Sequence, residues 1–192
     1  AAVVTDAASI QTSIIGAINT LVTTADNALT AYVAAPATIA TASGTGETLQ
    51  NAINALPEGA LANEFNAQLL VGEAELTLLV ADATAAQTAV TALPTGDLKT
   101  ALQNRLDTIG FVVDMNAATD ATEAKDVLDE QLPTGYAALS DALKVKVATI
   151  VWNTGTDYTS VAGYNTAVAG AIQLHTVNNA SNSTEARTAL QP

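Results

Sequence analysis

Apolar residues recur at steps of three and four along most of this chain, and that spacing places them on one face of an α-helix. Three rows are the clearest: Leu61, Phe65 and Leu69; Leu98, Leu102, Leu106 and Ile109; and Leu139, Leu143, Val147 and Ile150. No stretch shows the sustained alternation, bounded by tight turns, that is typical of strands. The pattern therefore predicts an all-α protein with helices near residues 5–33, 47–56, 60–81, 84–93, 97–117, 121–131, 136–152, 158–177 and 183–190.

A short phrase, Leu-Pro-x-Gly, precedes each row and is the strongest recurring motif. Its copies are Leu56–Gly59, Leu93–Gly96 and Leu132–Gly135, at steps of 37 and 39 residues. These steps lie in the range of helical repeat proteins. A proline pushes the preceding residue out of the α region, and Pro-x-Gly turns the chain. We expect Ala-rich helical hairpins or bundle repeats joined by Leu-Pro-x-Gly turns, with Leu93 and Leu132 buried at helix ends and Gly96 and Gly135 beside helix starts.

A second similarity concerns helix starts. The segment that begins at Asn116 is similar to the one that begins 62 residues later. Asp120 and Asn182 stand where a helix should begin, and Glu123 and Glu185 follow three residues on. An Asp or Asn N-cap with such a glutamate is similar to the reciprocal capping box. We expect a short capped helix to begin after each of these residues.

The repeats divide the chain into expected parts. These are residues 1–44, a degenerate N-terminal helical repeat; 45–157, a helical repeat array; and 158–192, the start of a further, truncated helical unit. The first part is degenerate because Val22 stands where a proline would complete its similarity to Ala52–Pro57. The last part breaks off at Pro192, where another helix is due. We therefore expect a segment of a longer repetitive protein, or a final helix that docks elsewhere.

Composition narrows the classes of partner. Six basic residues against nineteen acidic ones leave a net charge of −13, which argues against nucleic acid and anionic membranes, since both need clustered Lys and Arg. No uninterrupted apolar run is long enough to span a bilayer. Cysteine is absent, which excludes disulfides and thiolate chemistry. The scarcity of Lys, Arg and aromatic residues favours an exported protein, at the bacterial cell surface or outside the cell.

Carboxylate and amide residues gather at two predicted joints and suggest a weak cation site. The candidate calcium ligands are Asp114, Asn116, Asp120, Asn153 and Asp157. Calcium needs about six to eight oxygen ligands, which turns can supply, but neither cluster matches the EF-hand pattern. The other interpretation is that these residues are solvated helix caps. No other cofactor is expected.

Other residue types that often carry chemistry have ordinary structural interpretations. His175 lies among apolar residues without a catalytic companion, so packing is its expected role. Trp152 is expected to anchor a helix end, with sugar stacking as the alternative. We interpret the acidic run as a solvated helix face rather than as an acid–base pair in a cleft. Its members are Glu123, Asp126, Asp129 and Glu130. No catalytic residue is assigned, and an enzyme is the class that we expect least.

The repeated phrases resemble a known kind of protein. Residues 178–190 and Asn54–Gly59 are similar to helical repeats in large bacterial cell-surface proteins of the S-layer-like type. The resemblance covers most of residues 45–192 and implies an exported structural or adhesive role with no catalytic residue.

Three functions compete. The first is a structural, self-assembling module of a surface layer, filament or stalk, whose partners are further copies or neighbouring repeats. The second is an adhesive or ligand-binding module, which should display exposed aromatic or Arg residues. The third, an ice-ordering surface, requires threonines at a constant step, and the threonines here follow none.

Overall fold

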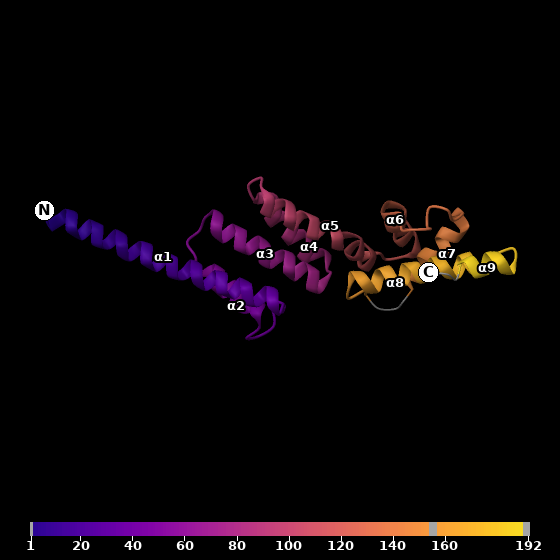
Figure 1. Ribbon diagram of the computed structural model, residues 1–192, viewed down its shortest axis with the longest axis horizontal. Coiled ribbons are helices and arrows are strands. Elements are labelled where there is room, and N and C mark those ends of the chain that lie inside the picture. Colours follow the sequence, from indigo (N-terminus) through magenta and orange to yellow (C-terminus); the bar gives the residue numbers. More distant parts are fainter. Residues whose placement is uncertain (1, 154–156, 190–192) are drawn as a thin grey trace. The chain divides into compact units, whose positions relative to one another are not determined.

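The computed structural model describes residues 2–153 and 157–189 (Figure 1). Within these ranges every regular element is an α-helix and no strand occurs, so the predicted all-α class is confirmed. Residues 154–156 of one predicted joint, and residues 190–192 at the end of the last predicted repeat, lie outside the described ranges. The helices form two compact units, residues 1–77 with 81–106 and residues 78–80 with 107–192.

The first unit is built around the second half of a long helix. Its elements are α1 (Ala2–Ala34), α2 (Thr45–Asn54), α3 (Ala60–Thr77), most of α4 (Val80–Ala92) and the first half of α5 (Asp97–Ala117). Helix α1 packs on α2 and α3. The shared core consists of Ala25, Ala28, Tyr32, Leu49, Ile53, Leu56, Phe65 and Leu69. The two alanines keep the backbone of α1 close to its neighbours, which is how a chain with few aromatic residues fills a core.

Helices α1 and α3 approach each other closely at Gly72 of α3, which lies against the ring of Tyr32 of α1. A Cβ atom on Gly72 would lie 2.4 Å from the Tyr32 hydroxyl oxygen and 2.6 Å from Cε1. Such distances are far below van der Waals contact. Glycine at this position is therefore what allows the ring to pack at 3% exposure.

The second unit contains the rest of α5 and the helices that follow it. They are α6 (Ala121–Gln131), α7 (Asp141–Trp152), α8 (Val161–Asn178) and α9 (Ser183–Ala189). Each of α6, α7 and α8 packs on the next helix along the chain. The core includes Val112, Leu128, Tyr136, Val147, Val151 and Tyr164, all at 1% exposure or less. Tyr158 packs edge-on against Tyr164, with the ring centroids 5.3 Å apart.

The three Leu-Pro-x-Gly segments fall in connections between helices, after α2, α4 and α6. Leu93 is buried at the end of α4, and Gly96 directly precedes α5. Leu132 contradicts the expectation of burial, because its side chain is 57% exposed. Its backbone adopts the left-handed conformation, with φ 49°, and its N–H closes α6 by donating to Leu128 O.

The connection after Leu132 also moves the next helix start. Tyr136 N donates to Pro133 O at 2.9 Å, and Leu139 N donates to Tyr136 O at 3.0 Å, so residues 133–139 form successive turns. Tyr136 is fully buried in place of the leucine. Helix α7 therefore begins at Asp141, and Gly135 does not adjoin a helix start as expected.

The predicted helix over 60–81 is interrupted before its end. Helix α3 ends at Thr77 and α4 begins at Val80. The intervening Leu78 has φ 53° and is only 1% exposed. The apolar spacing does not reveal this break, because an apolar residue also suits a continuing helix.

The apolar rows are only partly buried, and Leu61, the first member of its row, is 43% exposed. Leu102 and Leu106 lie in the first unit and Val147 lies in the second. Ile150 was expected in the core but is 38% exposed, so that part of the row is wrong. The three repeat-based parts of the chain stay a prediction; α1 packs on α2 across the boundary proposed between residues 44 and 45.

Candidate functional site

The most elaborate polar cluster of the second unit is centred on Asn116, near the end of α5. Its Oδ1 accepts from Tyr158 N at 2.8 Å, and its Nδ2 donates to Tyr158 O at 3.0 Å and, at 3.5 Å, to Leu78 O. One amide side chain thus satisfies backbone groups of two segments that are distant in sequence. Leu78 leaves the helical conformation at the end of α3, so its carbonyl needs such a partner.

Trp152 strengthens the same region. It is the last residue of α7, and its Nε1 donates to Ala118 O at 3.0 Å, just beyond the end of α5. The expected role of Trp152 as the anchor of a helix end is confirmed. Together with Asn116, it brings residues 116–118 next to Trp152 and Tyr158, which lie on either side of the second predicted acidic joint.

The candidate calcium ligands make individual structural contacts in this region. The Asn116 oxygen is already used by Tyr158 N. Asp120 caps α6, with one oxygen accepting from Thr122 N at 2.7 Å and from Glu123 N at 2.9 Å. Asn153 forms the C-cap of α7, while Asp114 and Asp157 are exposed. Within residues 2–153 and 157–189, no group of three or more His, Cys, Asp and Glu residues is placed to hold a metal ion. Calcium binding by these residues stays a prediction.

Two of these carboxyls have shifted pKa values for opposite reasons. The two backbone N–H groups at the start of α6 favour the charged form of Asp120 and hold its pKa below the usual range. Although Asp114 is exposed, partial desolvation of its carboxyl, with a smaller contribution from the nearby Glu130, raises its pKa. Asp120 is therefore a stable anion, as its capping role requires.

The predicted N-caps Asp120 and Asn182 are confirmed at α6 and α9. The reciprocal half of the capping box differs, because each glutamate accepts from the N–H of the residue before the cap and not from the cap itself. Glu123 reaches back to accept from Thr119 N at 2.7 Å. At α9, Asn182 accepts from Thr184 N and Glu185 N, both at 3.0 Å, and the Glu185 carboxylate accepts from Ser181 N. A third glutamate, Glu47 of α2, accepts from Ser43 N in the same manner. Similar local chemistry therefore starts three separate helices.

The acidic face of α6 is more than a solvated surface. Asp129 pairs with Lys125 on its own helix and, at 3.0 Å, with Lys144 of α7. These two lysines hold the pKa of Asp129 below its usual range. Lys144 also lies 5.1 Å from the centre of the Tyr136 ring. This ion-pair group connects α6 to α7, and sequence reasoning missed it because its partners are 15 residues apart.

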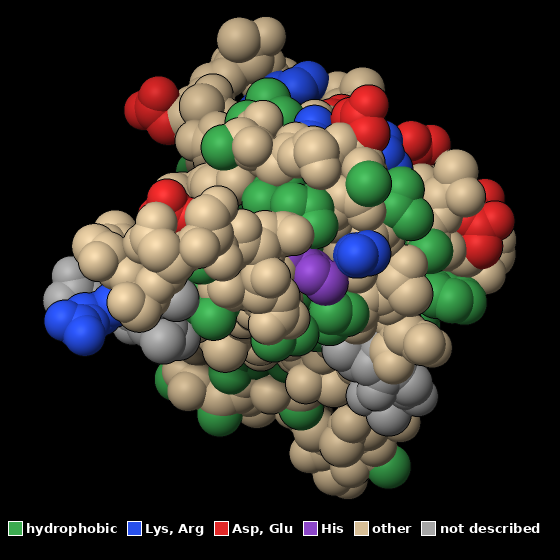
Figure 2. All heavy atoms as spheres, turned by 90° about the vertical axis from the view of Figure 1, so that its right-hand side faces the viewer, with side chains coloured by type: hydrophobic (Ala, Val, Ile, Leu, Met, Phe, Trp, Pro, Cys, Tyr) green, Lys and Arg blue, Asp and Glu red, His purple; other side chains and the backbone are tan. Residues whose placement is uncertain are grey.

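His175 is half-buried on α8 among apolar residues, as expected for a packing residue. Its Nε2 is buried and has no hydrogen-bond partner among the described residues. Figure 2 shows this histidine, the only one in the chain, beside hydrophobic side chains.

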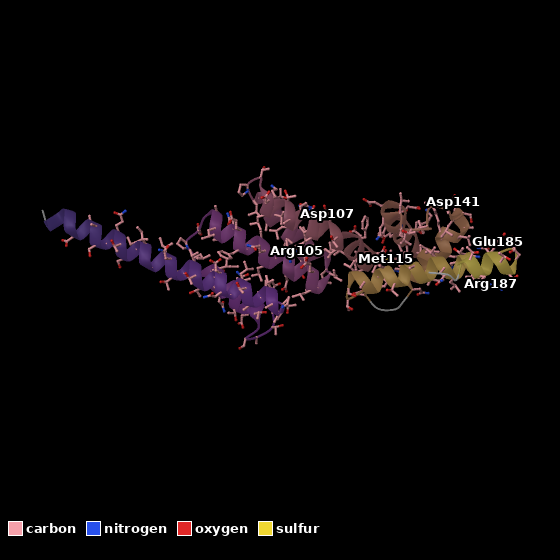
Figure 3. The ribbon with its side chains drawn as sticks, viewed as in Figure 1. Arg105, Asp107, Met115, Asp141, Glu185 and Arg187 are labelled. Atoms are coloured by element: carbon pink, nitrogen blue, oxygen red, sulfur yellow. The ribbon has the colours of Figure 1, made fainter. Side chains whose placement is uncertain are left out.

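The first unit has a pocket of about 240 Å³ beside Tyr32. Arg105, labelled on α5 in Figure 3, forms one wall and binds Glu75 of α3 with two hydrogen bonds, of 2.8 and 2.6 Å. Burial, with smaller contributions from Glu73 and Glu75, raises the pKa of Tyr32 to about 12, and its hydroxyl has no partner in the described structure. The sequence gives no signal for this pocket, because its lining comes from helices far apart in the chain.

Comparison with known proteins adds no further guide to function. No family model matches the chain, and no curated protein or solved structure matches it significantly. None of the helices in the described ranges combines the length and apolar character needed to cross a membrane.

Proposed function

We propose that this chain is a structural, self-assembling module of an exported bacterial surface protein, such as a surface layer, filament or stalk, and that it performs no catalysis. The proposal rests on one observation, which is that the same kinds of helix connection and helix start recur along the chain. Helices are separated by Leu-Pro-x-Gly segments after α2, α4 and α6, and glutamate-assisted starts recur at α2, α6 and α9.

Packing between neighbours in sequence supports the same function. Helix α1 packs on α2, α2 on α3, α6 on α7, α7 on α8, and α8 on α9. In repeat proteins each unit buries its apolar face against the next, so such an array can be extended without redesign of the core. The finer interpretation, that the units are true repeats joined by Leu-Pro-x-Gly turns and related to S-layer-like modules, is part of this proposal.

The polar features of the structure suit this role. The main polar contacts of the second unit are internal to the protein. Asn116 and Trp152 bind backbone carbonyls of distant segments, and Asp129 of α6 pairs with Lys144 of α7. The net charge of −13 keeps single copies apart at low ionic strength, since like charges repel. Salt, or calcium bridging the acidic joints, should therefore promote association.

An adhesive or ligand-binding module is the second candidate, because the second unit contains an open pocket of about 590 Å³. Its walls include Leu139 and Leu143 near the start of α7, and Thr176 and Thr188 from α8 and α9. Aromatic residues usually supply binding energy in such modules, and Trp152, at 37% exposure, is the one aromatic side chain that is exposed in the described ranges. Tyr32, Tyr136 and Tyr164 are all buried. We therefore prefer assembly.

Analytical ultracentrifugation of the purified chain, across a series of sodium chloride and calcium concentrations, tests the proposal. We expect the weight-average mass to rise with salt and to rise further with calcium. A chain that stays monomeric at every salt and calcium concentration would contradict self-assembly and favour a passive spacer.

A further inference from the structure

Helix α1 carries one apolar row along its length, but only half of that row is covered. Its members, at steps of three and four, are Ile10, Ile14, Ile18, Leu21, Ala25, Ala28 and Tyr32. The last three are 0%, 7% and 3% exposed and pack in the core with α2 and α3. The first three are 59%, 54% and 39% exposed. An uncovered row of isoleucines thus continues a surface that already packs against helices.

The geometry of the first unit explains this difference. The N-terminal half of α1 extends beyond α2 and α3, which cover only its C-terminal half (Figure 1). All side chains from residue 6 to residue 20 are exposed. An isolated helix with so many exposed isoleucines gains stability chiefly from packing on a partner.

Charge limits what the partner can be. Helix α1 has no basic residue, and Asp6 is the only charged side chain between residues 6 and 20. An acidic partner would therefore have no basic side chain to pair with, and a basic partner would have only the Asp6 carboxylate. The surface fits an apolar, nearly uncharged helix. The same segment of a second copy has this chemistry, and its single carboxylate leaves little like-charge repulsion between two copies.

The spacing is also self-complementary. Ile10 and Ile18 stand four residues before and after Ile14. If two copies lie antiparallel with the two-fold axis at Ile14, Ile10 of one copy faces Ile18 of the other, and the small Ala7 faces Leu21. The two Asp6 carboxylates then lie about 24 Å apart at a rise of 1.5 Å per residue. That separation exceeds the Debye length of about 8 Å at physiological salt, so their repulsion is screened.

We propose that the exposed isoleucine row of α1, made of Ile10, Ile14 and Ile18, is a docking surface for the same row of a second copy in antiparallel orientation. This inference rests on the proposed assembly function and names its surface. The overlap, residues 6–22, is about 25 Å long. It is smaller than a standard interface of about 1,600 Å², so one contact is weak and assembly depends on several acting together.

The test uses the full chain and two charge-matched variants. Ile14→Glu places two carboxylates at the axis of the pair. Thr12→Glu adds the same charge two residues away, about 200° around the helix and so on its opposite face. Sedimentation equilibrium is measured from about 10 μM to about 1 mM protein, the range suited to a weak contact. The salt is about 0.5 M, which screens the overall charge.

We expect Ile14→Glu to weaken pairing at least about 30-fold, and Thr12→Glu to change it by less than about threefold. Ile14 is exposed, so helix content by circular dichroism should be unchanged in both variants. If the original chain associates and Ile14→Glu associates equally well, the isoleucine row is not the surface, although assembly stands. If the original chain is monomeric at every salt and calcium concentration, both this inference and the proposed function fail.

Cysteine crosslinking tests the orientation, because the natural chain has no cysteine. An antiparallel pair brings the two copies of residue 14 together, so Ile14→Cys should form a disulfide dimer on mild oxidation. Ile10→Cys should not crosslink to itself but should crosslink to Ile18→Cys when the two variants are mixed. Self-crosslinking of Ile10→Cys as efficient as that of Ile14→Cys would overturn the antiparallel arrangement.

Discussion

Replacement of Gly72 by alanine should reveal how closely α1 packs on α3. In an open helix this change stabilises by about 1 kcal/mol, because alanine has the higher helix propensity. Here the added Cβ would lie 2.4 Å from the Tyr32 hydroxyl oxygen, 2.6 Å from Cε1 and 2.9 Å from Cζ. The ring or the helix must move by about 1 Å to reach ordinary contact distance.

The magnitude follows from these two opposing effects. Overpacking in a core destabilises a protein by about 1–3 kcal/mol. The added Cβ would be about 1 Å too close to a rigid ring, so we expect a destabilisation at the upper end of this range. After the gain in helix propensity is subtracted, we expect Gly72→Ala to lower the free energy of unfolding by about 1–2 kcal/mol. Denaturant unfolding followed by circular dichroism measures this difference.

Gly110 of α5 and Gly170 of α8 provide matched controls, because a Cβ on either would meet nothing within 4 Å. Alanine at these positions should stabilise by about 0.5–1 kcal/mol. In a Tyr32→Ala background the obstructing ring is gone, so Gly72→Ala should become stabilising as well. If Gly72→Ala stabilises the original chain as much as Gly110→Ala does, α1 does not pack on α3 in the manner described.

Four further substitutions probe the second unit. Asn116→Ala should lower the free energy of unfolding by about 1–3 kcal/mol, measured by urea denaturation, since it removes the partners of the Tyr158 and Leu78 backbone groups. Tyr164→Phe removes the 2.5 Å hydrogen bond that the Tyr164 hydroxyl donates to Gln131 Oε1, and it should destabilise by about 1 kcal/mol. Tyr136→Phe removes a buried hydroxyl that has no partner among the described residues, and it should be neutral or stabilising in the same assay. Because the folded-state pKa of Asp129 is lowered, its contribution is complete above its usual value of about 4 and is lost as the pH falls below that value. Asp129→Asn should therefore flatten the acid side of a stability–pH curve, and an unchanged slope below pH 4 would contradict the ion pairs.

Helices and their starts could be predicted from this sequence because the forces that set them are local. Asp120 and Asn182 each accept from backbone groups two and three residues ahead, so the residues that form the cap are adjacent in sequence. The steps of three and four in the apolar rows reflect the helix period itself. The same reasoning placed Leu93 at a buried helix end and Gly96 at a helix start.

Tertiary structure decided what happens at Leu78 and Leu132, the two leucines with positive φ in the part of the chain that the structure describes. At Leu78 an apolar residue adopts φ 53° because its side chain is buried and its carbonyl accepts from Asn116, 38 residues later. At Leu132 the side chain turns to solvent while Tyr136 fills the core. A sequence pattern gives the same apolar signal for either outcome, so only the packed neighbours distinguish them.

The apolar row of α1 shows the same difference between what local sequence determines and what packing determines. The sequence by itself determined that Ile10, Ile14 and Ile18 share one face of a helix with Ala25, Ala28 and Tyr32, because a helix repeats every 3.6 residues. Whether that face is covered depends on how far α2 and α3 extend along α1, and on the contact between Gly72 and Tyr32 that holds them there. Such contacts join residues 40 positions apart, which no local pattern encodes. The tertiary structure therefore decided that half of the row is core and half is exposed.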